Sequence, residues 1–120
     1  MNDIQTEEDI ETLVHTFYTK VRADEVLSPV FNEVIKGDWD RHLRTMCDFW
    51  STLLLYTRKY MSDPMIKHMP LPLQRGHFER WLELFNGTVA ELFEGDIARD
   101  AIRRAGNIAR VMQGVKGITA

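Results

Sequence analysis

The sequence predicts an all-α protein, and two observations carry that prediction. Apolar residues recur at intervals of three and four along most of the chain, which is the spacing of one face of an α-helix. No segment shows the sustained alternation of apolar and polar residues that is typical of a half-buried strand. With 120 residues, 44% of them hydrophobic and 28% charged, the chain fits one folded domain over residues 1–120 rather than a disordered protein.

The first predicted helix begins after Thr6, because Thr6 and Asp9 have the spacing of a capping box. The helix should end near Asp24. One face of it carries the apolar residues that should point into the core, namely Ile10, Leu13, Val14, Phe17, Tyr18 and Val21.

A short helix over residues 30–35 should follow. Ser28 is a suitable cap, and Pro29 is tolerated at the first helical position because its missing N–H would have no partner there. Gly37 should end this helix. Asp38 then caps a long helix that runs to about Tyr56, with a bulky stripe at three- and four-residue steps made of His42, Met46, Phe49, Trp50 and Leu53.

Pro64 opens one helical turn over residues 65–68, which Pro70 and Pro72 prevent from continuing. A further helix is predicted from about residue 75 to residue 93, with Phe78, Trp81, Leu82, Phe85 and Val89 facing inward. The last helix should run from Asp96 to a C-terminal cap at Gly114, with Ile97, Ala101, Ala105, Ile108 and Met112 facing inward.

Charge and hydropathy exclude some classes of function. A net charge of -3 and a pI near 5.8 lack the basic footprint that nucleic-acid binding requires, so no nucleic-acid partner is expected. The acidic N-terminus does not resemble a signal peptide, and no apolar run reaches the roughly 18 residues of a membrane span. We therefore expect a cytoplasmic protein without a membrane partner. The single cysteine, Cys47, is interpreted as a packing residue.

Aromatic residues are more numerous than a small helical bundle needs for packing, since aliphatic side chains fill such cores more easily. They lie on several predicted helices, and a flat ligand held between these helices would explain the excess. The aromatic and imidazole side chains concerned are Tyr18, Phe31, His42, Phe49, Trp50 and Trp81.

Three stretches resemble the truncated haemoglobins, and most closely their third group, also called P-type. They are "FYTKVRADEVLSPVF" (residues 17–31), "HLRTMCDFW" (42–50) and "KHMPLPLQRGHFERWLELF" (67–85). The resemblance implies a single truncated globin domain over residues 1–120. Its fold would be a two-over-two helical sandwich that encloses one haem b, iron protoporphyrin IX.

Two histidines compete for the role of proximal iron ligand. The resemblance places His68, at the end of a short helical turn, on the iron, whereas His77 falls within the next helix. Without the resemblance, a lone histidine in such a loop is more often a surface side chain. His77 can stack on Trp81 or approach a haem propionate.

On the opposite, distal face of the haem the resemblance places Tyr18, His42 and Trp81. Each can donate a hydrogen bond to a bound ligand, and His42 can also gate its entry. Each has an equally plausible ordinary role: Tyr18 and Trp81 as core aromatics, and His42 as an exposed residue at a helix start. Phe31 should stack on the porphyrin edge. Other predicted pocket residues are Met46, Phe49 and Trp50, for which plain packing would look identical in sequence.

The porphyrin carboxylates need cations or donors at the pocket mouth. Lys67 and Arg75 flank the proximal segment and are the first candidates, and Arg58, Lys59 and Tyr60 follow the distal helix. A solvated charge cluster is the alternative interpretation of any one of them.

The resemblance implies binding of O2, NO, CO or similar small ligands at the iron. Several distal donors would hold O2 too firmly for oxygen transport, which favours detoxification of nitric oxide or peroxide and leaves simple O2 binding or sensing as the alternative. No flavin or nicotinamide module is present, so turnover requires an external reductase or a small reductant. Two readings without haem are a helical protein-interaction module and a metal site of His42, His68 and His77, although no two of these histidines share i, i+4 spacing.

Overall fold

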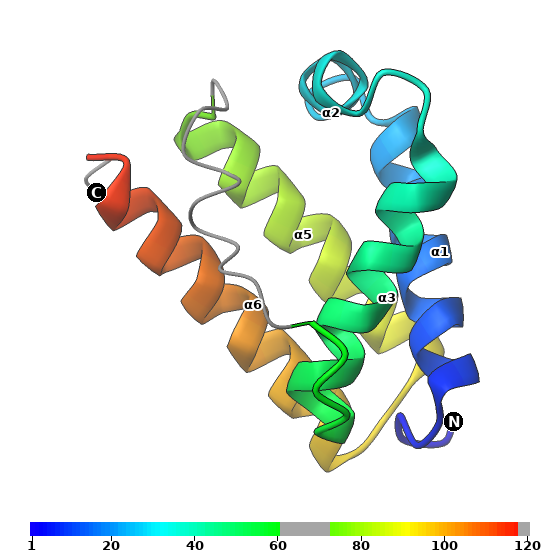
Figure 1. The fold of residues 1–120 in the computed structure, drawn as a ribbon. Helices are drawn as coiled ribbons and strands as arrows, with labels where there is room; N and C mark the ends of the chain where they lie inside the picture. Colours follow the sequence, from blue (N-terminus) through cyan, green and yellow to red (C-terminus); the bar gives the residue numbers. More distant parts are fainter. Residues whose placement is uncertain (61–72, 118–120) are drawn as a thin grey trace.

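The computed structural model describes residues 1–60 and 73–117 (Figure 1). These two ranges contain no strand, and they form five α-helices: α1 (Glu7–Ala23), α2 (Ser28–Ile35), α3 (Trp39–Leu55), α5 (Arg75–Leu92) and α6 (Asp96–Val115). The all-α prediction is therefore confirmed for the described part of the chain. Within it, no helix has the length and apolar character needed to cross a membrane.

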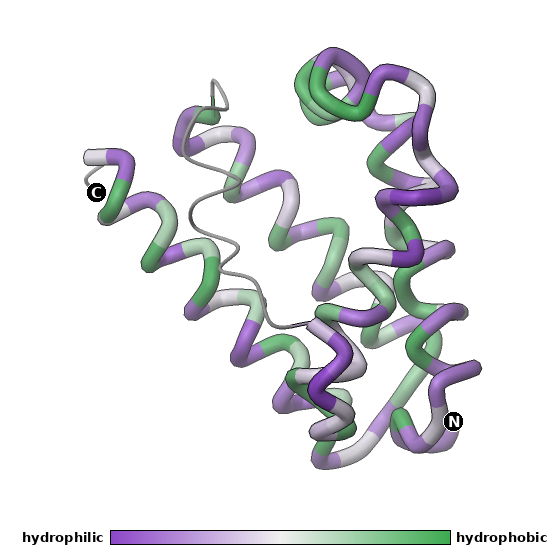
Figure 2. The backbone as a smooth tube through the Cα atoms, in the orientation of Figure 1, coloured by the Kyte–Doolittle hydropathy of each residue, from purple (hydrophilic) through white to green (hydrophobic). Residues whose placement is uncertain are grey.

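The helices pack as two pairs. In Figure 1, α1 lies beside α3 and α5 lies beside α6, and contacts between α1 and α5 and between α3 and α6 join the two pairs. The short helix α2 packs against α1. Hydrophobic and hydrophilic residues alternate along the helices in Figure 2, as expected when one face of each helix is packed and the other faces solvent.

The beginning and the inner face of α1 confirm the prediction from sequence. The Thr6 hydroxyl accepts a hydrogen bond from the Asp9 N–H at 3.1 Å, and the Asp9 carboxylate accepts one from the Thr6 N–H at 3.1 Å, which completes the capping box. Asp24 is the C-terminal cap. The six apolar residues predicted to face inward are the buried residues of this helix.

The predicted boundaries of α2 and α6 need correction. Helix α2 begins at Ser28 instead of being capped by it, because the turn before it is already closed by a hydrogen bond from the Ser28 N–H to the Asp24 carbonyl at 2.9 Å. Helix α6 continues through Gly114 to Val115, and the left-handed residue that follows is Gly117, with φ 79°. A glycine in the last turn of a helix can keep helical angles, so the sequence position alone did not fix the end.

The N-terminal segment caps a helix at the other end of the chain. The Asp3 carboxylate accepts hydrogen bonds from the N–H groups of Ile97 (2.9 Å) and Ala98 (2.8 Å) in the first turn of α6. Gly95 has φ 145°, and a Cβ added there would collide with the Asp3 side chain. The connection between α5 and α6 therefore requires glycine at this position.

The core centres on Phe17, whose ring is 4.8 Å from Tyr18, 5.3 Å from Phe85 and 5.7 Å from Trp81 between ring centroids. Burial is uneven among the helices. Helix α2 has no fully buried residue. Of the bulky α3 stripe only Trp50 is fully buried, so the rest of that stripe faces partly open space.

Candidate functional site

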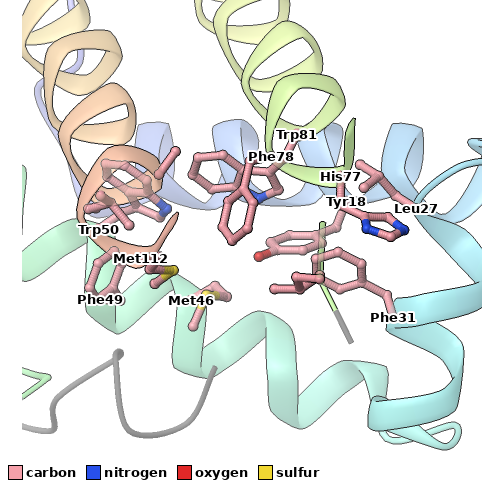
Figure 3. A pocket seen from close by; sticks show the side chains of 13 residues that line it. Tyr18, Leu27, Phe31, Met46, Phe49, Trp50, His77, Phe78, Trp81 and Met112 are labelled. Atoms are coloured by element: carbon pink, nitrogen blue, oxygen red, sulfur yellow. The ribbon is translucent and has the colours of Figure 1, made fainter. Parts of the chain in front are cut away.

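A large pocket lies among the helices and is lined by side chains from α1, α2, α3, α5 and α6 (Figure 3). It encloses about 700 Å³ of empty space, part of which is open to solvent. The predicted site residues that line it are Tyr18, Phe31, Met46, Phe49, Trp50, His77 and Trp81.

Two further hollows adjoin this pocket and share its walls. Phe31 and Met46 also line a hollow between α2 and α3, and Phe49 and Ile108 also line one between α3 and α6. Tyr60 lines both of these hollows, and its ring lies edge-on to Phe49 with centroids 5.3 Å apart. The three spaces are therefore compartments of one cleft along α3.

Tyr18 presents a polar group to this largely apolar pocket. Its side chain is 4% exposed, and its hydroxyl points into the pocket in Figure 3. The hydroxyl makes no hydrogen bond within the described part of the chain. Burial, and to a lesser degree the neighbouring Cys47, raises the pKa of Tyr18 far above its usual value. The phenol therefore stays protonated and remains a hydrogen-bond donor at physiological pH.

Trp81 supplies a second donor from α5. Its indole is stacked on Phe85, with centroids 5.5 Å apart and planes at 10°, and lies edge-on to Phe17 at 5.7 Å. The indole nitrogen faces the pocket in Figure 3. An indole N–H can only donate, so Tyr18 and Trp81 both present a donor to the pocket, which Trp50 and His77 also line.

His42 occupies a different position from these two donors. It does not line the main pocket but lines the hollow between α2 and α3. Its ring lies edge-on to Tyr18 at 4.9 Å and to Trp39 at 5.8 Å, with interplanar angles of 87° and 90°. The structure thus places His42 directly against the Tyr18 ring, at the junction of two compartments.

His77 is engaged at the start of α5. Its Nδ1 accepts a hydrogen bond from the Gln74 N–H at 2.9 Å, which forms part of the cap of this helix. An imidazole that accepts through Nδ1 and is neutral carries its proton on Nε2. The ring lines the main pocket but makes no ring contact with Trp81, so the predicted stacking between these two residues is not observed.

Among the described residues, none of the cations predicted for the haem propionates lines the cleft, whereas Tyr60, also a candidate, does. Lys67 and the proposed ligand His68 lie outside the described residues. Arg75 and Arg58 are exposed and line none of the three compartments. Lys59 forms an ion pair with Glu7 at 2.8 Å, which holds the pKa of the Glu7 carboxyl below its usual value.

Several cleft residues were not predicted from the sequence. The main pocket is also lined by Leu27 and Leu73 from the connections before α2 and α5, and by Phe78, Ile108, Ala109 and Met112, which have the same helical spacing as ordinary core residues. The side compartments contain three arginines, Arg41, Arg103 and Arg104. Nothing in the local sequence separates these arginines from the solvated cations of the other helix faces.

Cys47 is half-buried on α3. Burial, reinforced by the carboxylates of Glu11, Asp48 and Glu7, raises the pKa of the thiol to about 11. The thiol is therefore protonated at neutral pH, in agreement with its interpretation as a packing residue.

Comparison with known proteins identifies the family. A family model for bacterial-like globins matches residues 2–113. The group 3 truncated hemoglobin of Campylobacter jejuni subsp. jejuni is 33% identical over 111 residues, which are 89% of this chain and 87% of that protein. The crystal structure of group III truncated hemoglobin from Campylobacter jejuni matches with a TM-score of 0.88 and 32% identity, over 96% of this chain and 94% of that one.

These matches confirm the resemblance and the fold class that the three sequence stretches predicted. They also disfavour the two interpretations without haem, because membership of a globin family implies haem binding. The chain belongs to the bacterial-like globins, a family of haem-binding proteins, and has the fold of a group III truncated haemoglobin.

Proposed function

We propose that this globin binds one haem b through His68 and holds O2 or a related diatomic ligand with hydrogen bonds from Tyr18 and Trp81. The observation that carries the proposal is a pair of donors, the buried Tyr18 phenol and the half-buried Trp81 indole, that face a largely apolar pocket. A packed core would leave such donors paired or turned toward solvent.

The residues of the pocket fit a porphyrin. Aromatic and thioether side chains on α2 and α3, including Phe31, Met46 and Phe49, provide apolar walls for a flat macrocycle, and Phe78 and Met112 provide apolar walls from α5 and α6. When bound, haem would supply an iron that binds small gaseous ligands; His68 would hold the iron, and Tyr18 and Trp81 would donate hydrogen bonds to the ligand.

The assignment of the axial ligand to His68 rests on the resemblance of the segment "KHMPLPL" to the proximal segment of the family. The hydrogen bond that His77, the other candidate ligand, already makes supports this assignment. His77 already uses Nδ1 to cap α5, and this bond fixes the ring at the helix start. A ligating imidazole binds iron through a nitrogen that carries no proton and donates its other N–H, whereas a neutral His77 that accepts through Nδ1 carries its proton on Nε2.

The two donors act on the ligand that occupies the distal space. A hydrogen bond to a group that carries charge is worth roughly 1.5 to 3 kcal/mol, and more than one donor can share the ligand. The Tyr18 phenol remains a donor because burial disfavours its ionisation. The His42 ring, 4.9 Å from the Tyr18 ring, supports the phenol from the side of the neighbouring compartment, where a ligand would enter.

Slow release of bound O2 suits a reaction of that O2 better than oxygen transport. We propose the conversion of nitric oxide to nitrate, in which NO, O2 and one electron yield one nitrate, or peroxide chemistry assisted by the same donors. The electron must come from an external reductase or a small reductant. Reversible O2 binding or sensing is the second candidate, and slow release is compatible with it.

Optical spectra of the ferric, ferrous and CO-bound protein test the cofactor and the axial ligand. The wild-type protein should show a Soret band and bind CO. His68→Ala should lose haem or require added imidazole to restore ligation, whereas the matched variant His77→Ala should keep the wild-type spectrum. The opposite result, retention in His68→Ala and loss in His77→Ala, would refute the assignment.

Nitric oxide consumption tests the proposed reaction. The reduced wild-type protein in the presence of O2 should convert NO to nitrate in proportion to the electrons supplied. Trp81→Phe should retain haem but release O2 faster and form less nitrate per electron. If nitrate yield is the same with and without the protein, the catalytic proposal fails and O2 binding or sensing remains.

A further inference from the structure

Asp24 is a buried carboxylate that has no part in the proposed chemistry. It lies at the C-terminal end of α1 and is 8% exposed. Its Oδ2 accepts hydrogen bonds from the N–H groups of Val26 (3.1 Å) and Leu27 (3.0 Å). Its Oδ1 accepts a hydrogen bond from Nε of Arg80 at 2.6 Å. One carboxylate therefore joins the end of α1, the turn into α2 and helix α5.

Each group held by Asp24 is next to a residue of the pocket. Leu27 is itself fully buried and lines the pocket. Arg80 directly precedes Trp81 on α5, and Tyr18 lies six residues before Asp24 on α1. The ion pair thus connects the two helices that carry the two distal donors, one residue from Trp81 and six residues from Tyr18.

The other contacts that hold Trp81 are aromatic. Its stacking on Phe85 and its edge contact with Phe17 bury apolar surface, but they vary little in energy when rings slide by a fraction of an ångström. A charge-assisted hydrogen bond is shorter and more directional, so it fixes the position of α5 along α1. The indole N–H must be placed to within a fraction of an ångström to serve as a donor.

We infer that Asp24 and Arg80 are positioning residues, which set the Trp81 indole and the Leu27 side chain relative to the Tyr18 hydroxyl. The inference rests on the proposed distal role of Tyr18 and Trp81. It adds that an ion pair outside the pocket sets the distance and orientation of these two donors. Neither Asp24 nor Arg80 touches the ligand.

A second ion pair between α1 and α5 provides the matched control. Lys20 and Glu91 are 2.7 Å apart, with side chains 32% and 58% exposed. Glu91 lies ten residues beyond Trp81 on α5, about 15 Å along the helix at 1.5 Å per residue, so this pair should not affect the indole. Substitutions in the two pairs change the same kind of contact at different distances from Trp81.

The experiment measures the C–O stretching band of the CO-bound ferrous protein, the O2 dissociation rate and the indole N–H resonance of Trp81 by NMR. Asp24→Asn and Arg80→Gln should shift the band and the resonance and accelerate O2 release at least fivefold. Arg80→Lys keeps a cation that reaches the carboxylate and should fall between wild type and Arg80→Gln. Glu91→Gln should match wild type in all three measurements.

Two direct variants separate this inference from the proposed function. If Tyr18→Phe and Trp81→Phe shift the C–O band but folded Asp24→Asn and Arg80→Gln do not, the positioning role is refuted and the distal donors stand. If neither Tyr18→Phe nor Trp81→Phe shifts the band, the distal role fails and the inference fails with it. Should Asp24→Asn not fold, the comparison of Arg80→Gln with Arg80→Lys decides, because Arg80 lies at the surface with a side chain 36% exposed.

Discussion

The Tyr18→Phe substitution should stabilise the cofactor-free fold and weaken ligand retention at the same time. The substitution removes one oxygen atom and leaves the ring, so the edge contacts with Phe17, Phe31 and His42 at 4.8, 6.0 and 4.9 Å are kept. What it deletes is a hydroxyl that is buried in an apolar pocket and makes no hydrogen bond within the described residues.

The two effects can be given magnitudes. An unsatisfied buried polar group costs about 1 to 3 kcal/mol, so the free energy of unfolding of the cofactor-free protein should rise by about 1 kcal/mol, the low end, because the pocket is partly open to water. At roughly 2.1 cal/mol/K per residue, this corresponds to an increase in Tm of about 4 °C for a chain of this length. Loss of one donor to the ligand, about 1.5 to 3 kcal/mol, should accelerate O2 dissociation by roughly 10- to 150-fold.

Thermal melts of the cofactor-free protein and stopped-flow O2 dissociation from the haem-loaded protein measure the two effects separately. Tyr56→Phe is the control, because Tyr56 is 76% exposed, its hydroxyl bonds to Arg104, and it does not line the main pocket; the substitution should leave the O2 off-rate unchanged and should not raise the Tm. A fall in Tm of several degrees in Tyr18→Phe would show that the hydroxyl has a partner in the fold. An O2 off-rate within a factor of two of wild type, under about 0.5 kcal/mol, would show that it does not face the ligand.

Three other measurements address the rest of the molecule. Asp3→Ala should lower the free energy of unfolding by about 1 to 2 kcal/mol in urea titrations at pH 7, because the first turn of α6 loses two hydrogen bonds to a carboxylate. Burial opposes ionisation of Asp3, but hydrogen bonds from backbone N–H groups lower its pKa overall. The stabilisation by the Asp3 carboxylate is therefore present above pH 4 and lost as the pH falls further. Below pH 4 the free energies of unfolding of wild type and Asp3→Ala should converge. Cys47, with a pKa raised to about 11, should react with iodoacetamide at pH 8 far more slowly than an unfolded control. Replacement of both Lys67 and Arg75 by Gln should accelerate haem loss, and an unchanged dissociation rate would remove these residues from the propionate site.

The sequence predicted α1 best because every local signal there agrees. The Thr6 and Asp9 capping box, the inward stripe and the end near Asp24 all follow from contacts within one helix. Predictions failed where contacts outside a single helix decide. The start of α2 depends on a turn closed by Asp24, and the pairing of Lys59 with Glu7 joins residues 52 positions apart, which no helical periodicity can indicate.

The pocket was predicted in its aromatic members but not in its aliphatic ones. Phe31 and Trp50 were unusual enough in sequence to suggest a ligand, whereas Ile108 and Ala109 have the same spacing as core residues of any helix. The α3 stripe illustrates the limit. Apart from Trp50, its residues are half-buried because they face the cleft, and a residue that faces a ligand has the same apolar character as one that faces another helix.

Helix α2 has eight residues, none of them fully buried, and its inner side chains face the cleft. An isolated helix of this length is not stable in water. The free energy of local unfolding of α2 should therefore depend on the group that fills the cleft beside it. Newly made chains without haem should therefore show rapid amide exchange in α2 while α1 is already protected. Haem binding in the cleft should therefore order α2 after the other helices. Proteolytic cleavage within α2 should then be faster in the haem-free protein than in the haem-bound protein, even while the other helices remain folded.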